Sequence, residues 1–431
     1  MSTGGMRATA AQQPSAAVGP LARAGSSAIL PPLAVIGAPV PDNAASGGAP
    51  DALVPSSTVS PSAVTGSSAA QQPSAAVDHQ FDVLDGLRGI AALCVFFYHS
   101  GNHAYAANGF LAVDFFFMLS GFVVAFSYKQ RLLDGRIGLA DFARRRFVRL
   151  YPMVLAGVML GALTLVAHNV ASPDQAYATA DMAAWIASGL LVLPYLLSNP
   201  FLDAVFPVNV VLWSLFLELV ANGVYAAAVR RVTLPVLGVL VCGGLGVIVL
   251  TGHVDGGGSI QTFWTGFARV AAGFAAGVLL FELRERGWLP RLGAGLFVTA
   301  LPLVVLTFLP PITNPLWIPL IYATFFAIIT AALHPHPGDR MIRVCRFLGI
   351  ISYPLYLLHR PLTALTVGFG KMVIPLSPAT YPLFVAIALA LSVGMSVFVV
   401  RYYETPLRLM LGRLLNRRRA LGLGPKPTVN G

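Results

Sequence analysis

Long apolar stretches, separated by short polar and basic segments, follow one another along most of this chain. Each is long enough to cross the hydrocarbon core of a bilayer, which takes roughly 20 helical residues. The predicted spans are 86–105, 110–128, 148–168, 207–229, 232–251, 262–282, 291–309, 315–334, 348–368 and 382–401. The pattern predicts an all-α fold: a polytopic integral membrane protein built as a ten-helix transmembrane bundle, with a disordered N-terminal tail.

One further apolar stretch, 183–197, is shorter and contains Pro194. If it does not cross, all the basic clusters fall on one side of the membrane, and the opposite loops carry a single basic residue, Lys371. Because cytoplasmic loops are rich in Lys and Arg, we expect ten spans with both termini cytoplasmic. The stretch 183–197 then becomes a re-entrant or interfacial segment on the outer side.

Residues 1–80 are rich in Ala, Ser and Pro, and the nonapeptide AAQQPSAAV occurs at both 10–18 and 69–77. Such a segment buries too little apolar surface to offset its ordering entropy. We interpret it as a disordered cytoplasmic tail, with a misplaced start codon as the alternative. The ten-span membrane domain is expected at 81–410, followed by a basic cytoplasmic C-terminal tail at 411–431.

Composition and charge exclude several classes of protein. The chain is 56% hydrophobic and 10% charged, whereas soluble domains carry about 25% charged residues. The net charge of +11 does not indicate nucleic-acid binding, because the basic residues form short clusters between apolar segments. The three cysteines are scattered and predict neither a metal site nor a disulfide framework.

Arg88 and His99 lie eleven residues apart in the first span. Eleven helical steps return to within about 20° of the same face and advance roughly 16 Å. We therefore predict an anion-binding guanidinium near the cytoplasmic mouth and a deeper imidazole on the same wall, suited to act as a general base. The alternative is a topology anchor and a hydrogen-bonded structural histidine.

Arg146 and Arg149 share one face at the start of the third span. Paired guanidiniums bind phosphates, so a phosphate-rich cytoplasmic donor such as a coenzyme A thioester would suit them. The alternative is a positive-inside anchor.

Ser214, Glu218 and Asn222 recur every four residues and predict one polar stripe along the fourth span. Glu218 would either orient a histidine or pair with an arginine. A packing network is the alternative.

Asp114 stands among phenylalanines in the second span and is expected to form an ion pair, for which Arg88, Arg146 and Arg149 are the candidates. Arg269, deep in the sixth span, needs an internal partner or a water-filled cavity. The pair Ser120-Gly121 would permit close helix packing.

Ser352, Tyr356 and His359 share one face of the ninth span, which supplies a second deep imidazole next to Arg360. The sequence Tyr403-Glu404-Thr405-Pro406 is interpreted as the structural end of the last span.

Taken in order from Phe81 to about Arg408, the chain resembles the acyltransferase-3 family of membrane O-acyltransferases. The segments that carry the resemblance are FDVLDGLRGIAALCVFFYHS, GFLAVDFFFMLSGF, RRRFVRLYP, LWSLFLELVANGVY, SYPLYLLHRPL and YYETPLR. The family pattern of an arginine, ten residues and a histidine falls on Arg88 and His99, and its basic-x-x-Arg pattern on Arg146 and Arg149. Its Trp-Ser-Leu-x-x-Glu pattern falls on Trp213, Ser214, Leu215 and Glu218, although the run after Glu218 is less aromatic than in many members.

The resemblance implies transfer of an acyl group, commonly acetyl, from cytoplasmic acyl-CoA to a hydroxyl of a carbohydrate or glycoside at the membrane or cell surface, by a multi-pass protein of the inner membrane. Acyl-CoA would be a co-substrate, and no cofactor would be bound permanently. A C-terminal hydrolase-like domain, present in some relatives, is not expected. The expected catalytic residues are His99, Arg88 and Glu218; the expected donor-binding residues are Arg146, Arg149 and Arg88. Further candidates are Asp114, Trp213, Ser214, Arg269, Tyr356 and His359.

Two other classes remain open on sequence alone. A transporter or exporter of a glycan or small molecule would also contain buried charges, but it predicts an internal inverted repeat, and none is visible. A receptor that only binds a glycan would not need the aligned arginine and histidine.

Overall fold

The computed structural model describes residues 81–100, 106–334 and 338–420. These residues are almost entirely helical and contain no β-strand; one isolated bridge joins Ala204 and Ser259. The predicted tail 1–80 and the last residues of the C-terminal tail, 421–431, lie outside the described residues.

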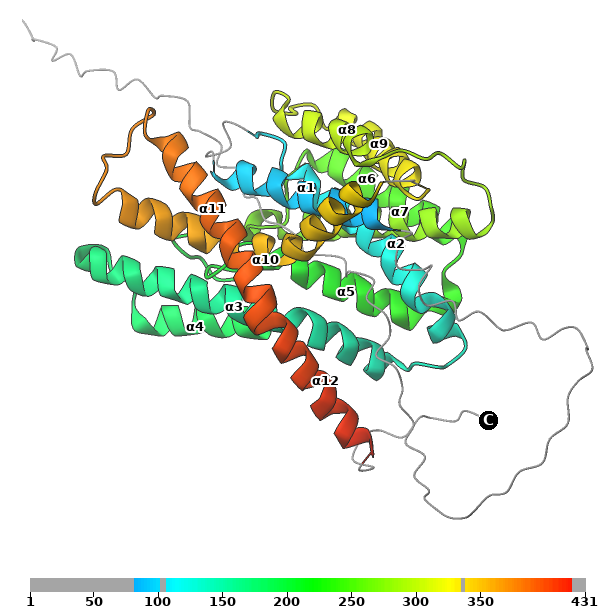
Figure 1. The fold of residues 1–431 in the computed structure, drawn as a ribbon, viewed down its shortest axis with the longest axis horizontal. Coiled ribbons are helices and arrows are strands. Elements are labelled where there is room, and N and C mark those ends of the chain that lie inside the picture. The colour runs from blue at the N-terminus through cyan, green and yellow to red at the C-terminus, as the bar shows by residue number, and fades with distance from the viewer. Residues whose placement is uncertain (1–80, 101–105, 335–337, 421–431) are drawn as a thin grey trace, which may run out of the picture.

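Figure 1 shows the helices packed as one bundle, with α11 and α12 forming a long rod across its face. The helices are α1 (Asp82–Ser100), α2 (Leu111–Leu133), α3 (Leu139–Ala171), α4 (Thr179–Leu191), α5 (Leu212–Ala228), α6 (Leu234–Thr251), α7 (Phe263–Glu285), α8 (Leu296–Phe308), α9 (Ile318–Ala332), α10 (Asp339–Gly370), α11 (Tyr381–Val399) and α12 (Thr405–Ala420). Short 3-10 turns cover Pro173–Gln175, Val229–Arg231, Ile260–Thr262 and Pro315–Trp317, and a π-helical turn covers Val400–Glu404.

Each of the ten predicted spans overlaps one of these helices, with residues 101–105 of the first lying outside the described residues, and the all-α polytopic fold is confirmed. Within the described residues, nine helices are long and apolar enough to cross a membrane. The seventh predicted span is the exception, because its helix α8 has only 13 residues. Pro290, Gly293 and Gly295 precede α8 and keep the first part of the predicted span 291–309 out of the helix.

The short stretch 183–197 falls partly in α4, which runs beside α3 (Figure 1). Helix α4 ends at Leu191; the next residue, Val192, has a left-handed φ of 52°, and Pro194 follows. The chain then stays largely non-helical until α5 begins at Leu212. At 13 residues α4 is as short as α8, so its length does not decide whether it crosses; the re-entrant or interfacial place of 183–197 on the outer side stays a prediction.

The predicted helix end at Tyr403-Glu404-Thr405-Pro406 is wrong, because α11 continues into α12 and crosses the proposed domain boundary at residue 410. The π-helical turn lies directly before Pro406. A proline has no N–H to donate, and the wider turn lets the helix continue past this missing hydrogen bond.

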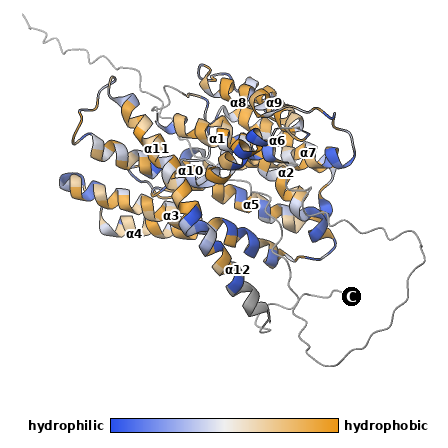
Figure 2. Ribbon diagram, in the orientation of Figure 1, coloured by the Kyte–Doolittle hydropathy of each residue, from blue (hydrophilic) through white to orange (hydrophobic). Residues whose placement is uncertain are grey.

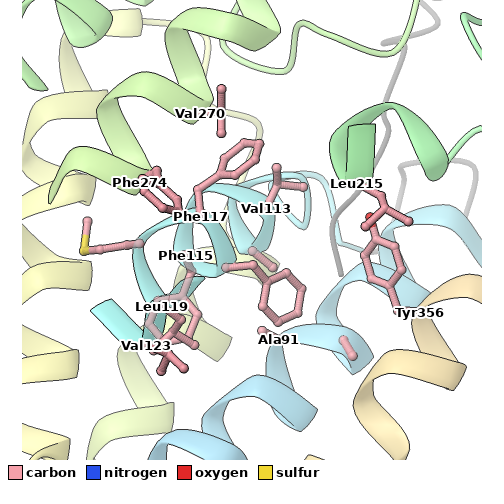
Figure 3. Packing of buried hydrophobic residues seen from close by; sticks show 14 of the residues in the cluster. Ala91, Val113, Phe115, Phe117, Leu119, Val123, Leu215, Val270, Phe274 and Tyr356 are labelled. Carbon is pink, nitrogen blue, oxygen red and sulfur yellow. The ribbon is translucent and has the colours of Figure 1, made fainter. Parts of the chain in front are cut away.

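Bare glycine surfaces bring α2 and α7 into backbone contact. A Cβ on Gly121 would lie 2.0 Å from the carbonyl oxygen of Phe274, and one on Gly277 would lie 1.9 Å from that of Met118. Helices approach this closely only where small residues face each other, so the packing role predicted for Ser120-Gly121 is confirmed. Figure 3 shows the result, with Phe117 of α2 beside Phe274 and Val270 of α7.

The helices at the centre of the bundle are more deeply buried within the protein than those at its edge. The described span of α2 is 83% buried within the protein, whereas that of α6 is 17% buried. The exposed side chains of α6 are mostly valine and leucine, which suits a helix that faces lipid. The core therefore lies around α1, α2 and α7.

Polar side chains gather at one end of the bundle, which we call the basic end. Lys129 at the end of α2 pairs with Glu282 at the end of α7, and Arg346 near the start of α10 pairs with Asp82 at the start of α1. Figure 2 shows hydrophilic ribbon in α12, at the start of α3 and at the end of α2. The basic clusters thus share one end, as their positions in the sequence predicted, and which compartment this end faces stays a prediction.

Asp114 and Arg269 form a fully buried ion pair between α2 and α7. Arg269 donates from Nε to Asp114 Oδ1 at 3.1 Å and from Nη2 to Oδ2 at 2.7 Å, and Tyr322 of α9 donates to Oδ1 at 2.7 Å. Arg269 also donates to the carbonyls of Gly256 and Phe110. The expected internal partner of Arg269 is therefore present.

The predicted partners of Asp114 are wrong: Arg88, Arg146 and Arg149 all lie elsewhere. The actual partner lies far from Asp114 in the sequence, because α7 packs against α2 although more than a hundred residues separate them. The ring of Trp213 covers the Arg269 guanidinium, with its centroid 5.6 Å away. Trp213 thus belongs to this structural cluster.

Replacing Arg269 with methionine should destabilise the protein by about 3–5 kcal/mol, because it leaves the Asp114 carboxylate buried without its cation. Unfolding in detergent, followed by circular dichroism, measures the loss. The double replacement Asp114→Leu, Arg269→Met should recover most of it, since both charges are then gone. Arg136→Met, which breaks the exposed pair with Asp134, serves as the control and should change stability little. An Arg269→Met protein as stable as the parent would contradict this assignment.

Candidate functional site

Arg88 joins α1 to α10 near the basic end. Its Nε donates to Ser352 Oγ at 2.8 Å, its Nη2 donates to the carbonyl of Gly349 at 2.5 Å, and its Nη1 lies 2.7 Å from Asp85 Oδ1. The side chain is only 1% exposed. Nε and Nη2 hold α1 against α10, and the ion pair of Nη1 with Asp85 on the same helix compensates the charge of Arg88.

Arg146 is paired with Glu218, which links α3 to α5. Arg146 Nη2 donates to Glu218 Oε1 at 2.9 Å, and Ser120 of α2 donates to the same oxygen. Asn222 completes the contact from one turn away, 3.4 Å from Oε1. Of the two roles open to Glu218, pairing with an arginine is the one the structure contains, and the polar stripe on α5 is confirmed.

Arg149 lies one turn beyond Arg146, yet it differs in having no ion pair or hydrogen bond to any residue that the structure describes. Its neighbours include three other guanidiniums, those of Arg146, Arg88 and Arg408. The carboxylates of Asp85 and Glu404 also lie within electrostatic range. Arg88, Arg146 and Arg408 are each paired with a carboxylate, so Arg149 is the member of this group that could contact an anionic ligand.

The two deep imidazoles are brought together by α1 and α10. The rings of His99 and His359 stack with centroids 5.3 Å apart and planes 29° apart. Because Arg88 meets Ser352 and His99 meets His359, the two helices run parallel, and Arg88 and His99 face the same neighbour as predicted. Roughly 16 Å of α1 separates them.

The tautomer of His359 follows from its surroundings. Its Nδ1 lies 2.7 Å from the carbonyl oxygen of Tyr356 and 3.2 Å from that of Leu355. A carbonyl can only accept, so Nδ1 carries the proton and Nε2 is the basic nitrogen. This Nε2 is buried and has no hydrogen-bond partner within the described ranges. His359 can therefore accept a proton from a group placed beside it.

Tyr356 and Ser214 form a polar link between α10 and α5. The Tyr356 hydroxyl lies 2.9 Å from Ser214 Oγ, which also donates to the carbonyl of Val211. Both side chains are buried, and Figure 3 shows Tyr356 beside Leu215 of α5. The contact between Ser214 and Tyr356 holds α5 against α10, one turn before His359. Asp114, Trp213 and Arg269 lie in the separate cluster of α2, α5 and α7.

A cavity of about 410 Å³ lies beside His99, at the end of the bundle opposite the basic end. Its walls come from α1, α3, α10, α11 and the segment 201–210. Arg360, Asn209 and Tyr381 line it, and the Tyr381 hydroxyl donates to the carbonyl of Ser100, which ties α11 to the end of α1. The volume suits a small-molecule or sugar ligand.

Several residues of this arrangement are not marked as site residues by any pattern in the sequence. Asn209 was hidden at the start of an apolar span, and Arg360 was noted only as a neighbour of His359. Asp85 contacts Arg88, and Ser120 contacts Glu218. No spacing in the sequence indicates that either residue makes this contact. Across the described residues, no three His, Cys, Asp or Glu side chains gather closely enough to hold a metal ion.

The sequence of this chain is similar to those of several known proteins. A family model described as an acyltransferase domain matches residues 81–401. The chain is similar to "Protein 2 in picA locus" of Rhizobium radiobacter, at 38% identity over 170 residues, which are 37% of this chain and 88% of that protein. It is also similar to the O-acetyltransferase OatA of Staphylococcus aureus, at 38% identity over 73 residues. That match covers 17% of this chain and only 12% of OatA. No solved structure matches the chain.

The different surroundings of Arg146 and Arg149 predict different effects on stability. Arg146→Gln should destabilise the protein by about 3–5 kcal/mol, because Glu218 remains buried without its cation. Arg149→Gln should leave stability nearly unchanged or raise it, because it removes one of several clustered positive charges. Thermal unfolding of both variants in the same detergent makes the comparison. Equal losses would show that Arg149 also has a structural partner.

Proposed function

The chain belongs to the acyltransferase family whose model spans residues 81–401, and we propose that it transfers an acetyl group from acetyl-CoA to a hydroxyl of a carbohydrate or glycoside. The enzyme is a multi-pass membrane acyltransferase. One observation supports this choice of donor and acceptor. The parallel helices α1 and α10 connect a cluster of guanidiniums at one end to two stacked imidazoles and a cavity at the other.

The donor is proposed to bind at the basic end. Arg149 provides the guanidinium that the protein leaves without a partner among the described residues, and Arg88 and Arg146, each paired with a carboxylate, lie next to it. The pyrophosphate and ribose phosphate of coenzyme A would dock there, with the thioester arm directed toward His99. Because cytoplasmic loops are the basic ones, this end would face the cytoplasm in the inner membrane, where acyl-CoA is made.

The transfer step is assigned to His99. As the acceptor oxygen attacks the thioester carbonyl, His99 takes the hydroxyl proton; the C–S bond breaks, and the thiolate leaving as coenzyme A receives that proton. His359 Nε2, next to the ring of His99, provides a second basic nitrogen for the proton. A two-step route, in which His99 first accepts the acetyl group, uses the same residues.

Glu218 acts through Arg146 in this proposal. It contacts Arg146, Ser120 and Asn222, so it positions the arginine pair and is not placed at the reacting atoms. Family membership favours an enzyme over the transporter and the glycan receptor that the sequence left open. The resemblance to OatA, whose name states O-acetyl transfer, supports acetyl as the group and oxygen as its acceptor.

Arg149→Gln should raise the KM for acetyl-CoA by about 10- to 100-fold and change kcat little, which corresponds to the loss of one charge-assisted contact of about 1.5–3 kcal/mol. Initial rates of coenzyme A release by purified protein measure both constants. Arg144→Gln is the control, because Arg144 pairs with Asp141 on its own helix and should behave as the parent. An unchanged KM would remove Arg149 from the donor site.

His99→Ala should lower kcat by at least about 100-fold, the usual contribution of a positioned general base. The variant should still insert in the membrane and bind acetyl-CoA with the parent's affinity. His168→Ala, on α3 and in contact with the carbonyl of Gln175, is the matched control and should keep full activity. Full activity of the His99 variant would overturn the catalytic assignment.

A further inference from the structure

We propose that the cavity beside His99 binds an acceptor that carries an anionic group, a carboxylate or a phosphate, and that Arg360 is the residue that recognises it. This inference rests on the proposed function and adds the chemical class of the acceptor.

Arg360 is a guanidinium on the cavity wall without a counter-ion. It follows His359 directly on α10 and lines the same cavity as His99. No hydrogen bond or ion pair joins it to another residue in the described part of the chain. Its titratable neighbours there are the phenols of Tyr98 and Tyr381 and the His359 ring, and none of these is a carboxylate. An arginine kept inside a membrane bundle needs an anion or water.

The acidic side chain of the neighbouring wall segment has other partners. Asp203 lies in the stretch that also contributes Phe201 and Asn209 to the cavity. It accepts hydrogen bonds from Ser198 Oγ at 2.7 Å, from the backbone N–H of Asn199 at 3.0 Å and from Gln261 Nε2 at 2.7 Å. Its carboxylate is therefore engaged within its own loop, and the positive charge of Arg360 is left for a ligand.

Two further wall residues present buried polar atoms without partners among the described residues, Asn209 Oδ1 and Thr363 Oγ1. Asn209 is 2% exposed and Thr363 is 8% exposed. The Asn209 amide nitrogen donates to the carbonyl of Leu357 at 2.8 Å, which leaves its oxygen as an acceptor. Buried polar atoms are normally paired, and sugar hydroxyls would supply the donors that both of these atoms can accept.

Together these groups describe an oriented acceptor. A carboxylate or phosphate of the glycan would pair with the guanidinium of Arg360, in the forked geometry that arginine favours. Asn209 and Thr363 would bind hydroxyls of the same unit. A neighbouring hydroxyl would then stand beside His99, so the anion decides which hydroxyl is acetylated.

The experiment compares three acceptors of equal size: methyl cellobioside, the same disaccharide with a glucuronic acid unit, and its 6-phosphate. Binding of each to purified protein in lipid nanodiscs is measured by equilibrium dialysis, without any donor. The parent should bind at least one anionic disaccharide about 10-fold or more tightly than the neutral one. The arm that binds tightest identifies carboxylate or phosphate as the natural group.

Arg360→Gln should remove this preference and leave the affinity for the neutral disaccharide unchanged, whereas Arg360→Lys should retain part of it. Lys371→Gln is the control, because Lys371 is an exposed cation at the end of the same helix and should keep the full preference. Thermal unfolding of every variant should match that of the parent, which shows that each is folded.

Two results would overturn the inference: a parent protein without preference for either anionic disaccharide, or an Arg360→Gln protein that retains the preference. In both cases Arg360 would only extend toward the membrane surface as a topology anchor. Because the measurement uses no donor, it is independent of acetyl transfer. Anion-selective binding without any transfer from acetyl-CoA would refute the proposed function and leave the binding site standing.

Discussion

A charge inside an apolar bundle has to meet an opposite charge, and this constraint organises the protein. The pair Asp114–Arg269 joins α2 to α7, and Tyr322 adds α9 to the same contact. Toward the basic end the pair Arg146–Glu218 joins α3 to α5 in the same way. Desolvation makes each pair a weak source of net stability, but breaking one is costly. The pairs therefore determine which helices can be neighbours.

Against that background the cations without partners stand out. Within the described residues, Arg149 at the basic end and Arg360 at the other end have no such contact, and both adjoin the α1–α10 pair. The stacked rings of His99 and His359 lie on the same two helices. A pair of parallel helices with the Arg149 guanidinium of α3 beside one end, and two imidazoles and the Arg360 guanidinium at the other, fits an enzyme that receives a donor from one side and an acceptor from the other.

Much of the fold followed from local properties of the chain. The length of each apolar stretch predicted where the helices lie, and the positions of the basic residues alone argue against a crossing at 183–197. The boundaries were less predictable. Glycine and proline shorten α8, and a π-helical turn carries α11 past Pro406 into α12. These outcomes depend on how backbone hydrogen bonds are rearranged locally, which hydropathy does not record.

The candidate site divides in the same way. Helical periodicity is enough to predict that Arg88 and His99 share a face and that Ser214, Glu218 and Asn222 form a stripe. The pairing of Asp114 with Arg269, the contact of Glu218 with Arg146 and the stacking of His359 on His99 become visible only in the packed bundle. The physical reason is that a partner is chosen by which helices touch. That choice depends on bare surfaces such as Gly121 and Gly277, distributed over distant segments of the chain.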